Sequence, residues 1–166
     1  LDTSGLRHHH ERAAGRSRTS YDNPAEAEVV IRRIRSIDYV ARAKKHDGKL
    51  SVLVLAGYAA QVGLLQDRLA AVSLDALEVE CNTVDAAQGR EADIVLFSVT
   101  RSNDRGMAGF LKLTRRINVA LSRARMGLAI VGDASFCAEH GGPLQDVLTY
   151  IGGHPDTCAV EILDDE

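Results

Sequence analysis

The sequence predicts an α/β fold in which a mostly parallel sheet carries helices on both faces. Helix and strand signals alternate along the 166 residues, and such alternation is typical of parallel strands joined by helical crossovers. The clearest strand signals are continuous apolar runs such as LSVLVLA at residues 50–56, which are typical of strands buried on both faces. The apolar share of 45% is large enough for the core of one compact domain.

The first twenty residues differ in composition from the rest of the chain. Residues 1–20 are polar, contain arginine and glycine, and show no hydrophobic period, so we expect a loop or mobile tail there. The folded domain is then expected over residues 21–166. The adjacent histidines His8–His10 could suggest a metal site or the remnant of a tag, but solvated loop residues are the simpler interpretation.

A helix is predicted directly after this segment. Asn23 is followed by Pro24 and, three residues after itself, by Glu26, which together form a capping box with proline at the first helical position. The helix should run to about Lys45. The apolar residues that recur at roughly helical spacing, and should therefore face the sheet, are Val29, Ile34 and Ile37.

The remaining elements alternate between strands and helices. Short apolar runs indicate strands, and apolar residues at helical spacing indicate helices. The predicted strands are 50–56, 77–81, 93–100, 127–132 and an edge strand at 158–163, and the predicted helices are 59–72, 114–124 and 143–150. Open sheets of this kind bind ligands outside the carboxyl ends of their strands.

Composition excludes several classes of protein. The sequence has no run of 18 apolar residues and no signal-peptide pattern, so we expect a soluble, cytoplasmic protein with no membrane partner. Cys81, Cys137 and Cys158 are too scattered for a disulfide framework or a zinc site and are expected to be reduced core thiols. The net charge of −3 argues against a protein that coats nucleic acid over its whole surface. Residues 101–125 nevertheless carry seven basic residues against one acidic residue.

Two stretches carry the strongest chemical signal. VDAAQGREADIVLFSVTRSN at 84–103 places a Gln-Gly-Arg-Glu turn before a buried strand, and GFLKLTRRINVALSRARMGLAIVGD at 109–133 places an arginine-rich helix before another. Polar groups at strand ends can reach a phosphate held elsewhere, and arginines complement its charge. No G-x-x-x-x-G-K-[S/T] loop occurs in the chain, so this chain should not hold a nucleoside triphosphate by itself.

These stretches resemble motifs V and VI of the superfamily 1 helicases of the nonsense-mediated-decay type. Val84 to Glu91 is similar to V-D-[AG]-[FY]-Q-G-R-E, and Arg115 to Arg125 is similar to R-R-L-N-V-A-[LI]-[ST]-R-A-[RK]. Weaker similarities lie upstream, where YDNPAEAEVV resembles an N-x-x-E-A helix start and AGYAAQVGLL resembles motif IV. The resemblance covers most of the chain. It implies the second RecA-like domain of such a helicase, with a P-loop NTPase fold that lacks its own Walker A loop.

The resemblance also implies roles in nucleotide hydrolysis. Arg123 matches the arginine finger of motif VI, and Arg116 lies two turns earlier on approximately the same face of the predicted helix. Glu91 would accept hydrogen bonds from the nucleotide ribose, while Gln88 and Gly89 would shape a turn at the interdomain cleft. ATP and Mg²⁺ would be bound mainly by a first RecA-like domain, which is the expected protein partner. The open alternatives are that the arginines, Arg125 above all, only solvate a surface helix, that Glu91 pairs with Arg90, and that Asp85 is structural.

A second set of residues is implied to contact single-stranded DNA or RNA. Thr83 and Val84 match family positions that touch the nucleic-acid backbone, and such contacts read no base sequence. The weaker candidates, each with a structural role as its alternative, are Tyr58, Gln61, and Arg101 with Asn103. Only 4% of the residues are aromatic, so we do not expect a broad surface on which bases stack.

Three positions depart from the family pattern. Ala87 replaces an aromatic residue, Ala56-Gly57 replaces Thr-Pro, and Leu113-Thr114 replaces Asp-Pro.

From the resemblance, the predicted function is a motor domain, inactive by itself, of an ATP-dependent helicase, and the alternative is a degenerate, non-hydrolytic binding or scaffold module. The intact Arg123 and Glu91 favour the motor domain. A dinucleotide-binding or flavodoxin-like regulator is disfavoured because no G-x-G-x-x-G follows a strand.

Overall fold

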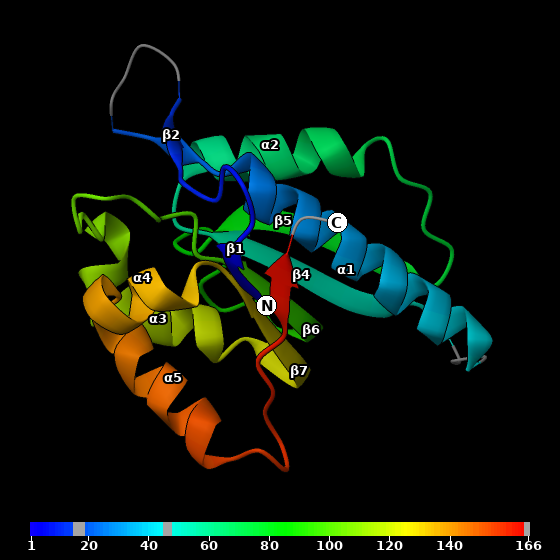
Figure 1. Ribbon diagram of the computed structural model, residues 1–166. Coiled ribbons are helices and arrows are strands. Elements are labelled where there is room, and N and C mark those ends of the chain that lie inside the picture. The colour runs from blue at the N-terminus through cyan, green and yellow to red at the C-terminus, as the bar shows by residue number, and fades with distance from the viewer. Residues whose placement is uncertain (15–18, 45–47, 165–166) are drawn as a thin grey trace.

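A four-stranded parallel sheet forms the centre of the protein. The computed structural model describes residues 1–14, 19–44 and 48–164, and Figure 1 shows its ribbon. The strand order is β5–β4–β6–β7, and all three pairings are parallel. The strands are β4 (Leu50–Ala56), β5 (Leu77–Thr83), β6 (Ala92–Ser98) and β7 (Ala124–Val131). The predicted parallel α/β architecture is confirmed, and it is consistent with a RecA-like fold.

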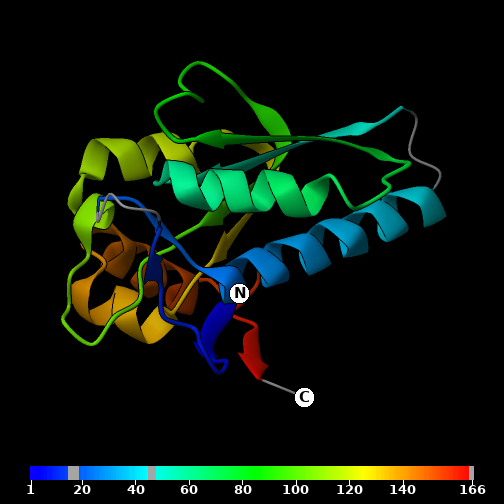
Figure 2. The same cartoon turned by 90° about the horizontal axis from the view of Figure 1, so that it is seen from above.

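Helices cover both faces of this sheet. On one face, α1 (Pro24–Ala43) and α2 (Ala59–Leu69) lie side by side, as Figure 2 shows from above. The other face carries the 3₁₀ turn η1 (Gly109–Lys112), α3 (Thr114–Leu121), α4 (Ala134–His140) and α5 (Pro143–Gly153). The core is therefore divided by the sheet into two apolar clusters.

The position of β4 inside the sheet, with helices on both faces, explains why its apolar run is continuous. Val52 and Val54 belong to the cluster under α1 and α2, whereas Leu53 and Leu55 belong to the cluster under α3. Successive side chains of a strand point to opposite faces, so a strand covered on both faces needs apolar residues at every position. All four side chains are at most 3% exposed.

The start of α1 follows the predicted pattern. Asn23 is the N-cap and accepts a hydrogen bond from the backbone N–H of Glu26 (3.1 Å), with Pro24 at the first helical position. Val29 and Ile34 are buried and Ile37 packs against the same cluster, so the predicted inward face is confirmed. The helix ends at Ala43, and the predicted end at Lys45 lies outside the described residues.

Several element boundaries differ from the predictions. The helix α2 ends at Leu69, and α3 ends at Leu121 with Ser122 as its C-cap. The strand β7 begins already at Ala124, because Ala124 pairs with Ala92 of β6. The sequence SRAR at residues 122–125 has no hydrophobic period that distinguishes the last helical turn from the first strand residue. Only the strand pairing with β6 therefore shows where β7 begins. The helix α4 was not predicted; Asp133 caps it by accepting a hydrogen bond from Phe136 N (2.9 Å).

The expectation of a loop or mobile tail over residues 1–20 is wrong for part of that segment. The strand β1 (Asp2–Gly5) pairs in parallel with β8 (Ile162–Asp164), and β2 (Arg12–Ala13) pairs with β3 (Tyr21–Asp22). Thr3 is fully buried. The strand partners of β1 lie about 160 residues away, so local periodicity cannot indicate them. Residues 15–18 of the predicted tail lie outside the described residues.

Two of the three cysteines are core thiols, as predicted. Cys81 and Cys137 are buried and free, and burial raises the pKa of the Cys81 thiol to about 12, so it stays protonated. Cys158 is also free but only partly buried. In the described part of the chain, each helix is too short or too polar to cross a lipid bilayer.

Candidate functional site

The loop between β5 and β6 is the motif V loop, residues 84–91, and its backbone is held by short-range hydrogen bonds. Thr83 O accepts from Ala87 N (3.1 Å), and Thr83 Oγ1 accepts from Ala86 N (3.3 Å). Gly89 has a φ of 81°, a left-handed conformation that favours glycine. Val84 and Ala87 are buried in the cluster under α3. Ala87 therefore anchors the loop in the core although it is smaller than the family's aromatic residue.

Arg116 lies on the first turn of α3 and faces this loop. Its Nη2 is 2.8 Å from Asp85 Oδ2, and both side chains are largely exposed, at 44% and 60%. An exposed ion pair of this kind contributes about 0–1 kcal/mol, so another anion can replace Asp85 at small cost. The two side chains border a hollow of about 270 Å³, which Val84, Gln88, Arg115 and Val119 also line.

Arg123 lies beyond the end of α3, which corrects the expectation that it shares one helical face with Arg116. Its Nε donates to Val119 O (3.0 Å) and its Nη2 to Ser122 Oγ (2.8 Å). Its Nη1 is 3.4 Å from Arg90 O. The guanidinium thus folds back over the carboxyl end of α3, where a cation is favourable, and bridges to the motif V loop.

Glu91 is exposed at the start of β6, beside the residue that Arg123 contacts. The alternative that it pairs with Arg90 is wrong, because the Arg90 side chain pairs with Glu80 instead. In the described residues, neither a hydrogen bond nor an ion pair holds the Glu91 carboxylate. Gln88 and Gly89 are exposed on the same loop. Arg123 thus contacts both α3 and the motif V loop, and the hollow beside Arg116 lies between the same two segments.

The motif IV residues have roles inside the protein. Gln61 is fully buried; its Oε1 accepts from Asn23 N (2.7 Å) and its Nε2 donates to Ser98 Oγ (2.9 Å). The expectation that Gln61 contacts nucleic acid is therefore corrected, because no part of it is accessible. Tyr58 is partly buried, and its hydroxyl oxygen accepts from Phe110 N (3.1 Å).

Arg101 is also internal and does not reach the surface. It is 3% exposed, its Nε donates to Met107 O (2.9 Å), and its Nη2 lies 3.3 Å from Glu11 Oε1. Its guanidinium carbon is 4.0 Å from the ring centroid of Tyr21. Asn103 donates to the same Glu11 carboxylate (3.0 Å). The predicted phosphate contact by Arg101 is therefore corrected to an internal ion pair.

Of the predicted nucleic-acid contacts in the described residues, Thr83, Tyr58 and Asn103 remain partly exposed, whereas Val84, Gln61 and Arg101 are buried. Val84 is 1% exposed, and its N–H donates to Ala56 O (3.1 Å). Thr83 is partly exposed at the carboxyl end of β5. This edge of the sheet is where open α/β folds bind ligands.

The sequence analysis did not predict the buried, long-range hydrogen bonds of the Glu26 side chain. This carboxyl group is fully buried and accepts from Ser98 Oγ (2.6 Å) and Thr100 N (2.8 Å). Burial raises its pKa to about 8, although both hydrogen bonds act in the opposite direction. The N-x-x-E-A pattern contained the signal, but as a capping box it predicted only a local contact.

The histidines of the amino-terminal segment face different groups. His8 is exposed, as predicted, whereas His9 Nδ1 lies 2.7 Å from Leu6 O and its Nε2 lies 3.5 Å from Asp133 Oδ2. His10 lies 3.7 Å from Asp104. Within residues 1–14, 19–44 and 48–164, no three His, Cys, Asp or Glu side chains are grouped to hold a metal ion.

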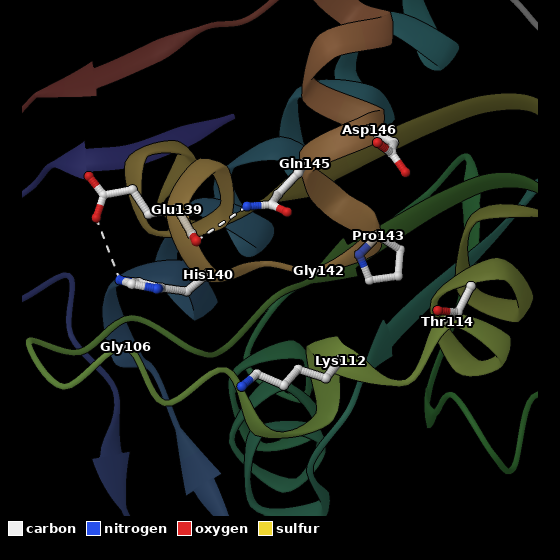
Figure 3. A pocket seen from close by; sticks show the side chains of 9 residues that line it. All are labelled: Gly106, Lys112, Thr114, Glu139, His140, Gly142, Pro143, Gln145 and Asp146. Carbon is white, nitrogen blue, oxygen red and sulfur yellow. Dashed lines mark hydrogen bonds and ion pairs between the residues drawn. The ribbon is translucent and has the colours of Figure 1, made fainter.

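A further hollow lies away from these residues, between the loop after β6 and the junction of α4 with α5. The hollow has a volume of about 530 Å³. Figure 3 shows its lining, which includes the basic side chains Lys112 and His140 and the carboxylates Glu139 and Asp146. Gln145 donates to the Glu139 carbonyl (3.2 Å) across the junction. No residue predicted for the site lines it, so the surface of motif V and α3 is the better candidate.

Known proteins share much of this sequence. A family described as "AAA domain" matches residues 1–135. The DNA-binding protein SMUBP-2 of Mesocricetus auratus is 37% identical over 147 residues, which cover 88% of this chain and 14% of that protein.

Two further relatives match shorter segments. The DNA polymerase alpha-associated DNA helicase A of Saccharomyces cerevisiae is 43% identical over 83 residues, 50% of this chain and 12% of that protein. The regulator of nonsense transcripts 1 homolog of Drosophila melanogaster is 52% identical over 62 residues, 37% of this chain and 5% of that protein. This chain thus spans 14% or less of the length of these three relatives.

Proposed function

This chain belongs to the superfamily 1 helicases of the nonsense-mediated-decay type, and we propose that it is the second motor domain of an ATP-dependent helicase or translocase. The observation that carries the proposal is that Arg116 and Arg123 both contact the motif V loop, which also carries Gln88. Two permanent positive charges and an amide, without a phosphate loop, suit a nucleotide that is held mainly by another domain.

The two arginines suit the charge that develops during phosphoryl transfer. That reaction spreads negative charge over the γ-phosphate oxygens, and a guanidinium can donate two parallel hydrogen bonds to them. Arg116 would exchange Asp85 for phosphate, because their exposed ion pair is weak. Arg123 would keep its Nε on Val119 O, while its Nη1, whose contact with Arg90 O is long at 3.4 Å, turns toward the nucleotide.

Glu91 and Gln88 would contact the rest of the nucleotide. The Glu91 carboxylate offers two acceptor oxygens, which suit the hydroxyl groups of a ribose. We assign Mg²⁺ and most phosphate contacts to the first RecA-like domain, because the described residues hold no cluster of metal ligands. Mg²⁺ bound there would neutralise charge on the β- and γ-phosphates.

A groove for single-stranded nucleic acid would begin at the carboxyl end of β5. Thr83 places a hydroxyl there, next to the backbone of the motif V loop. Hydroxyl and backbone groups bind phosphates without reading base sequence. Because the same loop would contact the nucleotide through Gln88 and Glu91, hydrolysis in the cleft would change the grip on the strand.

One observation favours the alternative of a non-hydrolytic module. Arg116 and Arg123 both have partners within this chain, Asp85 and the carboxyl end of α3. In a module that lost hydrolysis, these contacts would be the whole role of the two side chains. The two functions therefore differ in what happens when one arginine is removed.

The test is hydrolysis of ATP by the full-length protein with Arg116→Ala. We expect kcat to fall by at least about tenfold, because a charge that stabilises the transition state is lost. Arg105→Ala is the matched control, since Arg105 is exposed on the preceding loop and its side chain has no partner in the described residues. An Arg116→Ala protein that hydrolyses ATP like the control contradicts the proposal.

A further inference from the structure

Thr100, two residues beyond the end of β6, has an unusual backbone conformation. Its φ is 70°, in the left-handed region that favours glycine. For a β-branched residue this conformation is strained, and it persists only where the surrounding structure holds it. Thr100 is fully buried, so the groups that hold it can be identified.

Two side chains from the start of α1 fix both peptide groups of Thr100. Glu26 Oε2 accepts from Thr100 N (2.8 Å), and Asn23 Nδ2 donates to Thr100 O (3.3 Å). With the N–H and the C=O of the same residue both bound, rotation about its φ and ψ would break at least one of the two bonds.

The two holding side chains are themselves fixed. Asn23 N donates to Gln61 Oε1 (2.7 Å), and Asn23 Oδ1 accepts from Glu26 N (3.1 Å). Ser98 Oγ donates to Glu26 Oε2 (2.6 Å). All of these residues are fully buried. Glu26 has no cation beside it in the described residues, and such a buried carboxyl group is costly, so apolar packing would serve stability better at this position.

The conformation at Thr100 decides where the chain goes next. The following residue, Arg101, turns inward under Tyr21, and the loop is tied again where Phe110 N donates to the Tyr58 hydroxyl (3.1 Å). The loop leads through η1 directly to α3. A change at Thr100 would therefore shift the start of α3, which carries Arg116.

We propose that Glu26 is a positioning residue: with Asn23 it holds Thr100 in the left-handed conformation and so fixes the loop 101–110 that places α3 and Arg116 against the motif V loop. Its effect on ATP hydrolysis rests on the proposed function. Its effect on the loop does not, so the two can be tested separately.

The test is a double-mutant cycle on the full chain that compares Glu26→Met with Thr100→Gly. Methionine has a similar length but no acceptor for Thr100 N, and glycine adopts a positive φ without strain. Amide hydrogen exchange over residues 101–110 is the readout. We expect Glu26→Met to accelerate this exchange by at least about fivefold, the lower end of what a strained residue stores when converted to a rate factor.

Adding Thr100→Gly should return the loop exchange to near the wild-type rate, because glycine does not need to be held. Glu26→Gln should disturb the loop less than Glu26→Met, since its amide oxygen still accepts from Thr100 N. If Glu26→Met does not fold, Glu26→Gln carries the same comparison. Asn23 Nδ2 donates to Glu26 Oε1 (3.3 Å), and the amide N–H₂ of glutamine at that position would face this donor without accepting from it. Effects of Glu26 and Thr100 substitutions that simply add would overturn the proposal.

Asp38→Asn is the matched control on the same helix. Asp38 is a buried carboxylate that accepts from Ala76 N (2.8 Å) and lies 3.8 Å from Arg42, so the loss of its charge should destabilise the protein without a response to Thr100→Gly. In ATP hydrolysis by the full-length protein, Glu26→Met should lower kcat and Thr100→Gly should restore it. If kcat is unchanged by both substitutions although the amide exchange of residues 101–110 changes, the positioning role is overturned. A kcat insensitive to Arg116→Ala overturns the proposed function instead.

Discussion

Replacing Arg123 by alanine separates its proposed catalytic role from its structural role. The guanidinium bonds to Val119 O (3.0 Å), Ser122 Oγ (2.8 Å) and, at 3.4 Å, Arg90 O. Hydrogen bonds contribute about 0.5–1.5 kcal/mol each and less when exposed, so the protein should lose about 1–2 kcal/mol of stability. If Arg123 also stabilises the γ-phosphate in the transition state, kcat should fall about 10³-fold or more, which corresponds to about 4 kcal/mol of barrier.

Arg125→Ala is the control for this experiment. Arg125 Nη2 contacts Asp93 Oδ1 (3.0 Å) and Ser51 Oγ (3.2 Å) at the amino ends of the strands, so it is more than a solvated side chain. Its side chain is 52% exposed, and such a pair contributes about 0–1 kcal/mol. The two variants should therefore differ little in stability.

The two variants should differ strongly in hydrolysis. Single-turnover ATP hydrolysis by the full-length protein, with single-stranded nucleic acid in excess, measures the chemical step, and thermal unfolding measures stability. The KM for ATP should change less than kcat for Arg123→Ala, because the finger acts on transition-state charge. Equal losses of kcat for Arg123→Ala and Arg125→Ala would refute the assignment of Arg123.

Two further predictions concern the Glu26 carboxyl group and the predicted nucleic-acid contacts. The raised pKa of Glu26, about 8 against 4.5 when unfolded, means that the folded state binds the extra proton between these values; stability should therefore fall as pH rises from about 4.5 to 8, by at most about 1.4 kcal/mol per pH unit. Denaturant unfolding against pH checks this, with Glu26→Gln expected to flatten the slope even though Asp133 and Glu11 lie nearby; an unchanged slope would mean that Glu26 is ionised throughout. Arg101→Ala should lower the melting temperature and leave the salt dependence of oligonucleotide binding unchanged, whereas Thr83→Val should weaken binding and keep the melting temperature. A decrease of about one unit in the salt slope for Arg101→Ala would show that Arg101 contacts a phosphate of the nucleic acid after all.

The parts of the fold that sequence predicts well are those whose signal is local. The apolar run of β4 and the Asn23-Pro24 start of α1 each contain their own periodicity or cap, and both appear where predicted. The strand β1 has no such signal, because its stability comes from β8 at the other end of the chain.

The same distinction explains the site. Arg116 and the motif V loop were predicted together from the resemblance to motifs V and VI, and the structure brings them to one hollow. Gln61 and Arg101 looked like surface contacts because their partners, Asn23 and Glu11, are distant in sequence. Whether a polar side chain is a ligand or an internal tie depends on such partners, which only the folded chain shows.

The most direct test of the central claim is phosphate release measured in parallel for the full-length protein and for the isolated 166-residue chain. We predict ATP hydrolysis that single-stranded DNA or RNA stimulates in the full-length protein, and no turnover by the isolated chain, because its sequence contains no phosphate loop. Turnover at helicase rates that stays with the isolated chain through repurification would contradict the account, as would a full-length protein that binds nucleic acid but hydrolyses no ATP.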